Sequence, residues 1–213
     1  MPDINISIKY SKESLAIIKE LNSNCKFTHK NWGDEKLLNI RKEIRDHYRN
    51  IQEGICVYCR QPVSLQSASN AHVEHIAPKS LYSKFIFEPK NLCVVCADCN
   101  EIKREKEVTD CCENTISTTP KNYPRSSNAF IIYHPHFDEW DKHILIFSGF
   151  YVDITSKGAS TISICKLNRK LHKFGLDDRF VSNPKLFHVA QRLIECGNIE
   201  KIMNLFNSTE GDV

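Results

Sequence analysis

Two cysteine pairs in the first half of the chain have the spacing of a metal site. Cys56 and Cys59 form one C-x-x-C pair, and Cys96 and Cys99 form a second. Four thiolates brought together in this way make a tetrahedral cage that favours zinc. The 36 residues between Cys59 and Cys96 are more than a simple zinc ribbon contains, so the metal would close a long loop. The pattern predicts a structural zinc, and four buried reduced thiols are the alternative.

The other cysteines carry a weaker signal. Cys93 lies three residues before Cys96, so spacing alone also allows Cys93 and Cys96 to form the second pair. A free cysteine is often a small buried apolar residue, and we expect this of the cysteines without such a partner. The alternative for two of them, Cys111 and Cys112, is a second metal site. The full set is Cys25, Cys111, Cys112, Cys165 and Cys196.

Side chains that bear oxygen and nitrogen accompany the cysteine pairs. Glu74 and His75 are adjacent inside the intervening segment, Asn91 precedes the second pair, and Asn100 directly follows it. A neutral imidazole with its ordinary pKa near ~6.5 can take a proton from water at cellular pH. Carboxylate and amide oxygens suit a hard ion such as Mg²⁺ or Mn²⁺, which can hold the oxygens of a phosphodiester. The residue types fit metal-assisted hydrolysis of nucleic acid.

The order Glu-His, Asn-Leu and Cys-x-x-Cys-Asn resembles the signature of the HNH endonucleases. The resemblance implies a ββα-metal finger, in which two strands and a helix surround one catalytic ion, often beside a four-cysteine zinc. It implies that His75 is the general base and that Asn91 braces the loop between the strands. It also implies that Glu74 and Asn100 bind the catalytic Mg²⁺ or Mn²⁺. One departure is that Glu74 stands where the family more commonly has Asp.

The same resemblance bears on the zinc ligands and on the substrate contacts. Cys93 lies where the family tolerates many residues, which favours Cys96 and Cys99 as the second pair. Lys103 matches a frequent helix lysine and lies three residues after Asn100 on one helical face, so it is expected to contact a phosphate.

The strand that carries Glu74 raises a geometric question. His72 lies on the same face of a regular strand as Glu74 and is the second candidate for substrate binding, with a rim position as the alternative. Glu74 and His75, as strand neighbours, point to opposite faces. They can share one phosphate only at the edge of the strand or where the strand is irregular.

Apolar periodicity predicts the elements around this segment. Helices are expected over 12–22 and over 34–53, where Asp34 is the expected cap and Gly54 the expected end. Strands are expected at 129–133 and within 143–154, after a polar linker at 108–127. Another helix is expected to start at Thr161 or Ser163, and one or two helices over 184–206. The stripe of the second helix comprises Leu37, Ile40, Ile44, Tyr48 and Ile51, and is expected to be core, with a docking surface as the alternative.

A second resemblance concerns the C-terminal half. Residues 131–144 and 158–171 are similar to segments of the small nuclease subunits that accompany an ATPase in Septu and some retron anti-phage systems. This implies an ATPase partner in a hetero-oligomer and a role in defence. For His134, His136 and Asp138 we expect a turn with aromatic packing, and a third metal site is the alternative.

The bulk composition limits the class of protein. Of the 213 residues, 41% are hydrophobic and 26% charged, which is typical of a globular protein. The net charge of +3 is small for a protein that grips nucleic acid alone, so either folding gathers the basic residues on one face or a partner supplies part of the grip. No apolar run approaches the roughly 20 residues of a membrane helix, and no secretory signal is visible. We expect a cytoplasmic location.

The expected fold class is α+β. A ββα-metal finger, stapled by a four-cysteine zinc, is embedded in a largely helical protein with a small additional sheet. We expect an N-terminal helical region at 1–54, a nuclease module at 55–107 and a C-terminal α+β region at 108–213 that is a candidate for partner binding. The expected function is a metal-dependent endonuclease that acts on DNA in preference to RNA, with RNA as the alternative target. The alternative is a non-catalytic zinc module that binds nucleic acid or protein.

Overall fold

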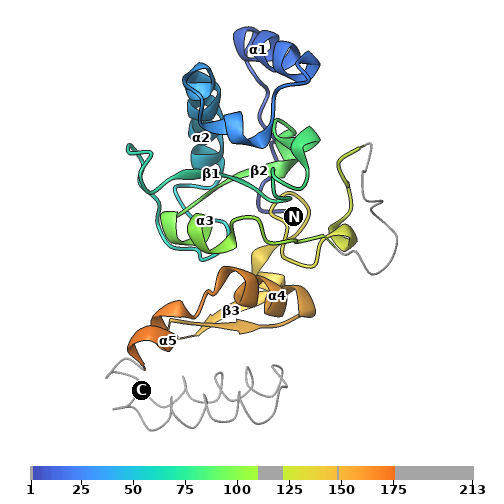
Figure 1. The fold of residues 1–213 in the computed structure, drawn as a ribbon. Helices are drawn as coiled ribbons and strands as arrows, with labels where there is room; N and C mark the ends of the chain where they lie inside the picture. The colour runs from blue at the N-terminus through green and yellow to red at the C-terminus, as the bar shows by residue number, and fades with distance from the viewer. Residues whose placement is uncertain (1, 110–121, 148, 176–213) are drawn as a thin grey trace, which may run out of the picture.

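The computed structural model describes residues 2–109, 122–147 and 149–175. They form α-helices, short 3-10 turns and two separate two-stranded antiparallel sheets, so the fold is mixed, as predicted. The N-terminal helices cover one side of the central sheet, and the C-terminal hairpin and helices lie on the other side of the short helix α3 (Figure 1). The α-helices are α1 (Lys12–Ser23), α2 (Leu38–Ile51), α3 (Ala97–Lys103), α4 (Ser156–Cys165) and α5 (Arg169–Phe174). The strands are β1 (His72–His75), β2 (Leu92–Val95), β3 (Ile144–Phe147) and β4 (Phe150–Asp153).

The two N-terminal helices form where the periodicity predicted them. The Ser11 side chain accepts from the Ser14 N–H and caps α1, as serine does at this position. The second predicted helix begins instead as a 3-10 turn at Glu35–Leu37, and Asp34 makes no side-chain cap. The predicted stripe is core: Leu37, Ile40, Ile44 and Tyr48 are buried, and Ile51 is partly buried against them.

The central sheet pairs β1 with β2 over four positions, from His72 opposite Val95 to His75 opposite Leu92. Every residue of β2 is buried, because α2 packs against it. The Gln52 amide donates to the Val94 carbonyl at 2.7 Å and accepts from the Val94 N–H at 2.8 Å. This side chain satisfies backbone groups that a further strand would otherwise bond.

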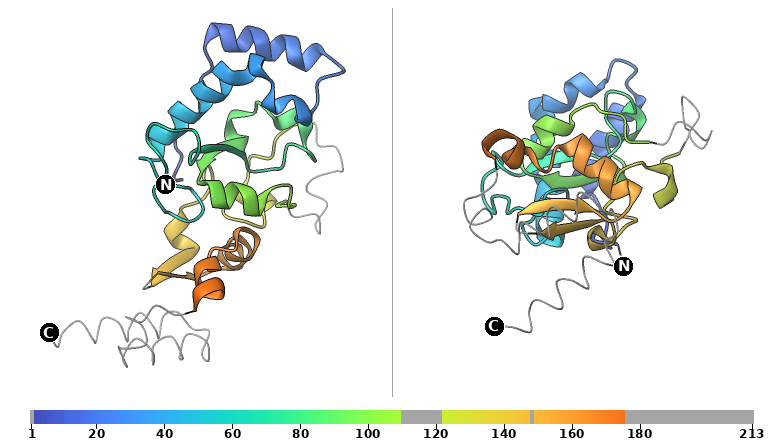
Figure 2. Two further views of the ribbon diagram at one scale, coloured as in Figure 1. Left: turned by 60° about the vertical axis from the view of Figure 1, so that its left-hand side comes forward. Right: turned by 90° about the horizontal axis from the view of Figure 1, so that it is seen from below.

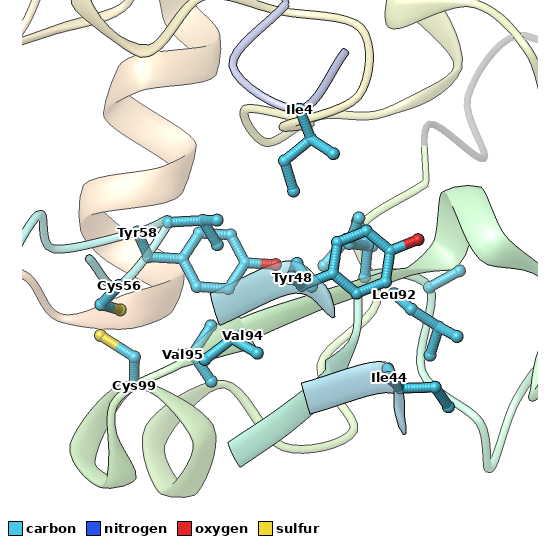
Figure 3. Close-up of a cluster of buried hydrophobic side chains, with 14 of the residues drawn as sticks. Ile4, Ile44, Tyr48, Cys56, Tyr58, Leu92, Val94, Val95 and Cys99 are labelled. Carbon is cyan, nitrogen blue, oxygen red and sulfur yellow. The ribbon is translucent and has the colours of Figure 1, made fainter. Parts of the chain in front are cut away.

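The core runs from the first residues of the chain to the cysteine pairs. Figure 3 shows Ile4 above Tyr48, with Val94 and Val95 of β2 between these side chains and the sulfurs of Cys56 and Cys99. The chain start is anchored by backbone hydrogen bonds from Asp3 and Ile4 to the loop at residues 135–138. The N-terminal, central and C-terminal segments therefore share one core.

Two predicted elements differ from the structure. Residues 129–133 form only an isolated bridge, between Thr109 and Phe130, because the Tyr133 N–H bonds to the Thr161 hydroxyl instead of to a strand. The helix expected to start at Thr161 or Ser163 starts earlier, at Ser156, where Thr155 caps it. The segment 143–154 is a hairpin, β3 and β4. The predicted helices at 184–206 and most of the linker lie outside the described residues.

Helix α4 packs very closely against the backbone at the start of the C-terminal hairpin. A Cβ atom on Gly158 would lie 1.9 Å from the His143 carbonyl oxygen, so only glycine allows this approach. Helix α4 also packs against α3. Both views in Figure 2 show α4 and α5 beside α3. Among the helices of the described residues, none has the length and apolarity needed to cross a membrane.

The His134–Asp138 segment is a packed turn. The His134 N–H donates to the Asp138 carboxylate at 2.9 Å, and the His134 ring stacks on Phe137 with centroids 4.2 Å apart. His136 reaches the Leu92 carbonyl of β2 through Nε2 at 2.8 Å. Within the described residues these side chains form no metal-binding group.

Candidate active site and metal centre

Four cysteines meet behind the central sheet. The sulfur atoms of Cys56, Cys59, Cys96 and Cys99 all lie within 4.8 Å of one another, and all four residues are buried. The Cys59 and Cys96 sulfurs are 3.7 Å apart, close to the ~3.8 Å edge of a tetrahedron with Zn–S bonds of ~2.3 Å. The cluster therefore fits zinc. Cys93, the competing choice, lies outside it.

Both halves of the cage are fixed from elsewhere in the chain. Trp140 Nε1 donates to the Tyr58 carbonyl at 3.0 Å, and the Tyr151 hydroxyl donates to the Cys59 carbonyl at 2.6 Å. On the other half, the Cys96 sulfur accepts from the Cys99 N–H and is the N-cap of α3. The cage thus sets the start of the helix that carries Asn100.

A cavity of about 510 Å³ borders α3, and three predicted residues line it together. Glu74 and His75 come from the end of β1, and Asn100 from the first turns of α3. Among the described residues, β1 pairs with a strand on one edge only, and it ends at His75. Glu74 and His75 point to opposite faces of β1. Both side chains reach one cavity because the cavity lies at the end of the strand, beside its open edge.

His75 is held as a neutral imidazole. Its Nε2 lies 3.1 Å from the Ile86 carbonyl oxygen, so Nε2 carries the proton and Nδ1 carries the lone pair. Trp32 packs against the ring at right angles, with centroids 4.6 Å apart. Burial, followed by the positive charge of Lys79, lowers the pKa of His75 to about 3. The imidazole is therefore unprotonated and able to accept a proton at neutral pH.

Glu74 is buried beside one cation. Lys103 Nζ lies 2.6 Å from Glu74 Oε1, and the lysine side chain is 0% exposed. The same ammonium donates to the His75 carbonyl at 3.0 Å. Burial raises the pKa of Glu74, and the charge of Lys103 opposes that rise. Lys103 therefore neutralises the carboxylate from within the fold and does not line the cavity, which differs from the expected phosphate contact.

Asn91 is fully buried in the connection between the strands. Its side-chain amide donates to the carbonyls of Ala77 and Phe85, at 3.1 and 3.0 Å, and its oxygen accepts from the Ala77 N–H at 2.7 Å. These bonds tie the chain after β1 to the chain before β2. They hold the loop that supplies the Ile86 carbonyl to His75.

His72 lies away from these groups. It is half-exposed, and its Nε2 is 3.0 Å from the Ser69 carbonyl oxygen. It is not among the residues that line the cavity. Its predicted role in substrate binding remains a prediction without support from this geometry.

Other cavity residues were not singled out from the sequence. Lys79 follows Pro78 in the loop after β1, and Arg104 ends α3. The Ser80 hydroxyl also lines the cavity, and its oxygen is buried without a hydrogen-bond partner in the described part of the chain. The sequence signal for Lys79 and Ser80 is proximity to His75, whereas Trp32 reaches the site from a distant segment and left no signal.

The comparison with protein families identifies this region. Residues 56–106 match the model described as HNH endonuclease. The HNH match begins at the first cage cysteine and ends just after α3, so it contains the cage, the β1–β2 pair and the cavity residues on them. No curated protein and no solved structure matches the chain.

The HNH region has the groups that a divalent ion needs. Glu74 and Asn100 offer oxygen donors to one cavity, which is large enough for a hydrated ion and a phosphate. Lys103 contacts only one of the two carboxylate oxygens. The Ser80 oxygen beside these donors has no hydrogen-bond partner in the described residues, so it is free to bind a water or a ligand.

Proposed function

We propose that this protein is a metal-dependent HNH-type endonuclease with its nuclease module at 55–107. The observation that carries the proposal is the shared cavity of His75, Glu74 and Asn100 within the HNH match. A zinc module that only binds a partner has no need for a neutral imidazole beside two oxygen donors. In this proposal β1, β2 and α3 form the ββα-metal finger, and the four-cysteine zinc supports it.

The roles of the side chains follow from their surroundings. His75 Nδ1 takes the proton of the attacking water, while the Ile86 carbonyl keeps the ring oriented. Glu74 and Asn100 hold Mg²⁺ or Mn²⁺, which when bound stabilises charge on the phosphate and the leaving oxygen. The negative charge of a bound phosphodiester raises the low pKa of His75, which favours proton uptake when substrate is present. Asn91 fixes the loop, and Arg104 and Lys79 meet the phosphate.

The substrate and the partner are finer parts of the same proposal. We propose DNA before RNA, and an ATPase partner in an anti-phage complex, because residues 131–144 and 158–171 resemble such nuclease subunits. The tight turn at His134–Asp138 falls within the first segment, and most of helix α4 falls within the second.

The decisive experiment compares the purified parent chain with His75→Ala and His75→Gln. Plasmid, single-stranded DNA and total RNA are incubated with each protein in Mg²⁺ and in Mn²⁺. We expect the parent to cut at least one substrate, and both variants to lose at least about 100-fold in rate, the scale of general-base catalysis. His75→Gln keeps most of the side-chain volume beside Trp32, so its loss is not a packing effect.

His47→Gln is the matched control. This half-exposed histidine of α2 bonds to the Ile6 carbonyl and lies outside the cavity. It should cut like the parent. Cleavage by His75→Gln at the parental rate, with zinc content unchanged, would rule out the proposed base.

A further inference from the structure

The candidate active-site cavity lacks the positive charge that a polyanionic substrate needs. Three carboxylates, Glu74, Glu101 and Glu105, line it against two cations, Lys79 and Arg104. Arg104 is itself paired with Glu101. Even when the buried Lys103 is counted, the charges only balance. Only the proposed divalent ion would give this cavity a net positive charge. Because phosphate neutralisation supplies most of the non-specific affinity for nucleic acid, a second basic surface would strengthen the grip.

A second cavity, of about 560 Å³, lies between α4 and α5 and has the opposite character. Its polar lining consists of Ser163, Lys166, Asn168, Arg169, His172 and Lys173, with no acidic residue among the lining residues. Lys166, His172 and Lys173 are exposed. We refer to it as the α4–α5 cavity. Two lysines that have no acidic partner in the described residues, and an arginine shared with Asp98 of α3, join hydroxyl and amide donors there, which suits the oxygens of a phosphate backbone.

Lys166 occupies a backbone position that normally selects glycine. It ends α4 in the left-handed conformation, with φ 45° and ψ 54°, and its N–H bonds to the carbonyls of Ile162 and Ser163. Glycine is the usual residue at such a helix end, because an L side chain is strained there. Within the described residues the Lys166 ammonium has no hydrogen bond or ion pair. The lysine side chain at this helix end is therefore available to a ligand.

The α4–α5 cavity is attached to the helix that carries Asn100. Arg169 pairs with Asp98 of α3 at 3.1 Å, and Lys106, just after α3, donates to the Ile164 carbonyl of α4 at 2.6 Å. Asp98 and Asn100 are two residues apart, so they lie about 200° apart around the helix. The two cavities therefore flank α3, whose diameter with side chains is ~10–12 Å. A nucleic-acid strand with one charge per ~3.4 Å of axis spans this width with a few phosphates.

We propose that the α4–α5 cavity binds the phosphate backbone of the nucleic-acid substrate a few nucleotides from the bond that is cut. This inference rests on the proposed nuclease function and names the surface that holds its substrate. The overall charge of +3 gave no sign of a basic surface. In this proposal, folding gathers basic side chains at the α4–α5 cavity.

The test measures binding without cleavage. Fluorescence anisotropy follows a labelled DNA strand, its duplex and the matching RNA as each binds the full-length His75→Gln protein at several salt concentrations. In that background Lys166→Gly with Lys173→Gln should weaken binding about tenfold or more at low salt. The slope of log affinity against log salt should fall by about two, because each substituted lysine leaves one phosphate without a counter-charge.

Two further comparisons exclude a folding artefact. Lys166→Gly alone should raise the melting temperature, or leave it unchanged, while it weakens binding, because glycine relieves the left-handed backbone. Lys12→Gln with Lys19→Gln removes the same charge from two exposed lysines of α1, and it should leave affinity and slope within about twofold.

The outcomes separate this inference from the proposed function. Parental affinity and slope in the Lys166/Lys173 variant would overturn the inference, as would no binding by the unsubstituted background protein. His75-dependent cleavage together with that parental affinity would leave the nuclease standing and assign the α4–α5 cavity to an acidic protein partner. Weakened binding in a protein whose parent does not cut would support the surface and count against the nuclease.

Discussion

At the scale of residues, the environment of Glu74 and His75 matters more than their identity. The His75 ring is desolvated, packed by Trp32 and oriented by the Ile86 carbonyl. The Glu74 carboxyl group is equally buried, which raises its pKa, and the adjacent Lys103 favours its charged form. One lysine thus bonds to both catalytic candidates, through the Glu74 side chain and the His75 backbone. This arrangement makes Lys103 an internal counter-charge.

The internal counter-charge gives a stability prediction. Lys103→Met removes the ammonium but leaves the Glu74 carboxylate buried, and breaking a buried pair in this way costs about 3–5 kcal/mol. Urea unfolding of Lys103→Met, Glu74→Gln and the double variant measures the coupling between the two side chains. We expect the double variant to be more stable than Lys103→Met alone. Strictly additive effects would contradict a direct ion pair in solution.

At the scale of elements, the short helix α3 depends on the cysteine cage. It has seven residues, and an isolated helix of that length does not form in water. Its N-cap is Cys96, and Cys99 lies in its first turn, so a metal bound by both sulfurs fixes the helix start. Asn100 follows directly. A single peptide bond joins Cys99 of the cage to Asn100, the proposed ligand of the catalytic ion.

This connection predicts the effect of zinc removal. The parent should contain one zinc per chain, and Cys99→Ser should lose it together with any nuclease activity, even in excess Mg²⁺ or Mn²⁺. Elemental analysis and circular dichroism measure metal content and helix loss. Cys93→Ser is the matched control, because Cys93 is buried beside the cage but outside it. A variant of Cys93 that loses zinc would instead favour the Cys93–Cys96 pair.

At the scale of the whole molecule, a few contacts hold distant segments in one core. Asp3 receives hydrogen bonds from the Tyr133 hydroxyl and the Trp140 N–H and pairs with Arg60. His136 also joins segments that are distant in the sequence. Its Nε2 donates to the Leu92 carbonyl, and the Ser7 hydroxyl lies 3.4 Å from its Nδ1. The N-terminus, the turn at 134–138 and β2 thus meet on one imidazole.

This imidazole should make stability depend on pH. Burial lowers the pKa of His136 to about 4, with Lys90 and His47 nearby adding to the effect. The unfolded chain, with a pKa near ~6.5, binds the proton more readily. The stabilisation is therefore complete above pH ~6.5 and is lost as pH falls towards 4, by on the order of 3 kcal/mol.

Denaturant unfolding of the parent and His136→Gln at pH 7.5 and 4.5 checks this expectation. The difference in stability between the two proteins should shrink as pH falls. Both proteins share any release of metal from the cysteines, so that contribution cancels in the comparison. An equal difference at both pH values would mean that His136 is not desolvated in the folded state.

The sequence itself determined the features that depend on short spacing. C-x-x-C pairs place sulfurs within one turn, and a stripe with helical period defines α2 and its buried face, so these were predictable. The Glu-His and Asn-Leu motifs predicted the candidate site through their resemblance to the HNH signature. The strand predicted at 129–133 was wrong because, among the described residues, this segment has only the bridge between Thr109 and Phe130, and its Tyr133 N–H bonds to Thr161 of α4.

Only the tertiary structure decided which side chains are buried, which are paired and which line a cavity. Trp32 meets His75 through a contact between distant segments, and Lys103 turns inward because Glu74 needs a counter-charge. Lys166 and Arg169 come to flank α3 although about 70 residues separate them from it. Local spacing fixes which groups are available for chemistry. Long-range packing fixes which of them lose water, and the loss of water sets their protonation, their partners and their access to a ligand.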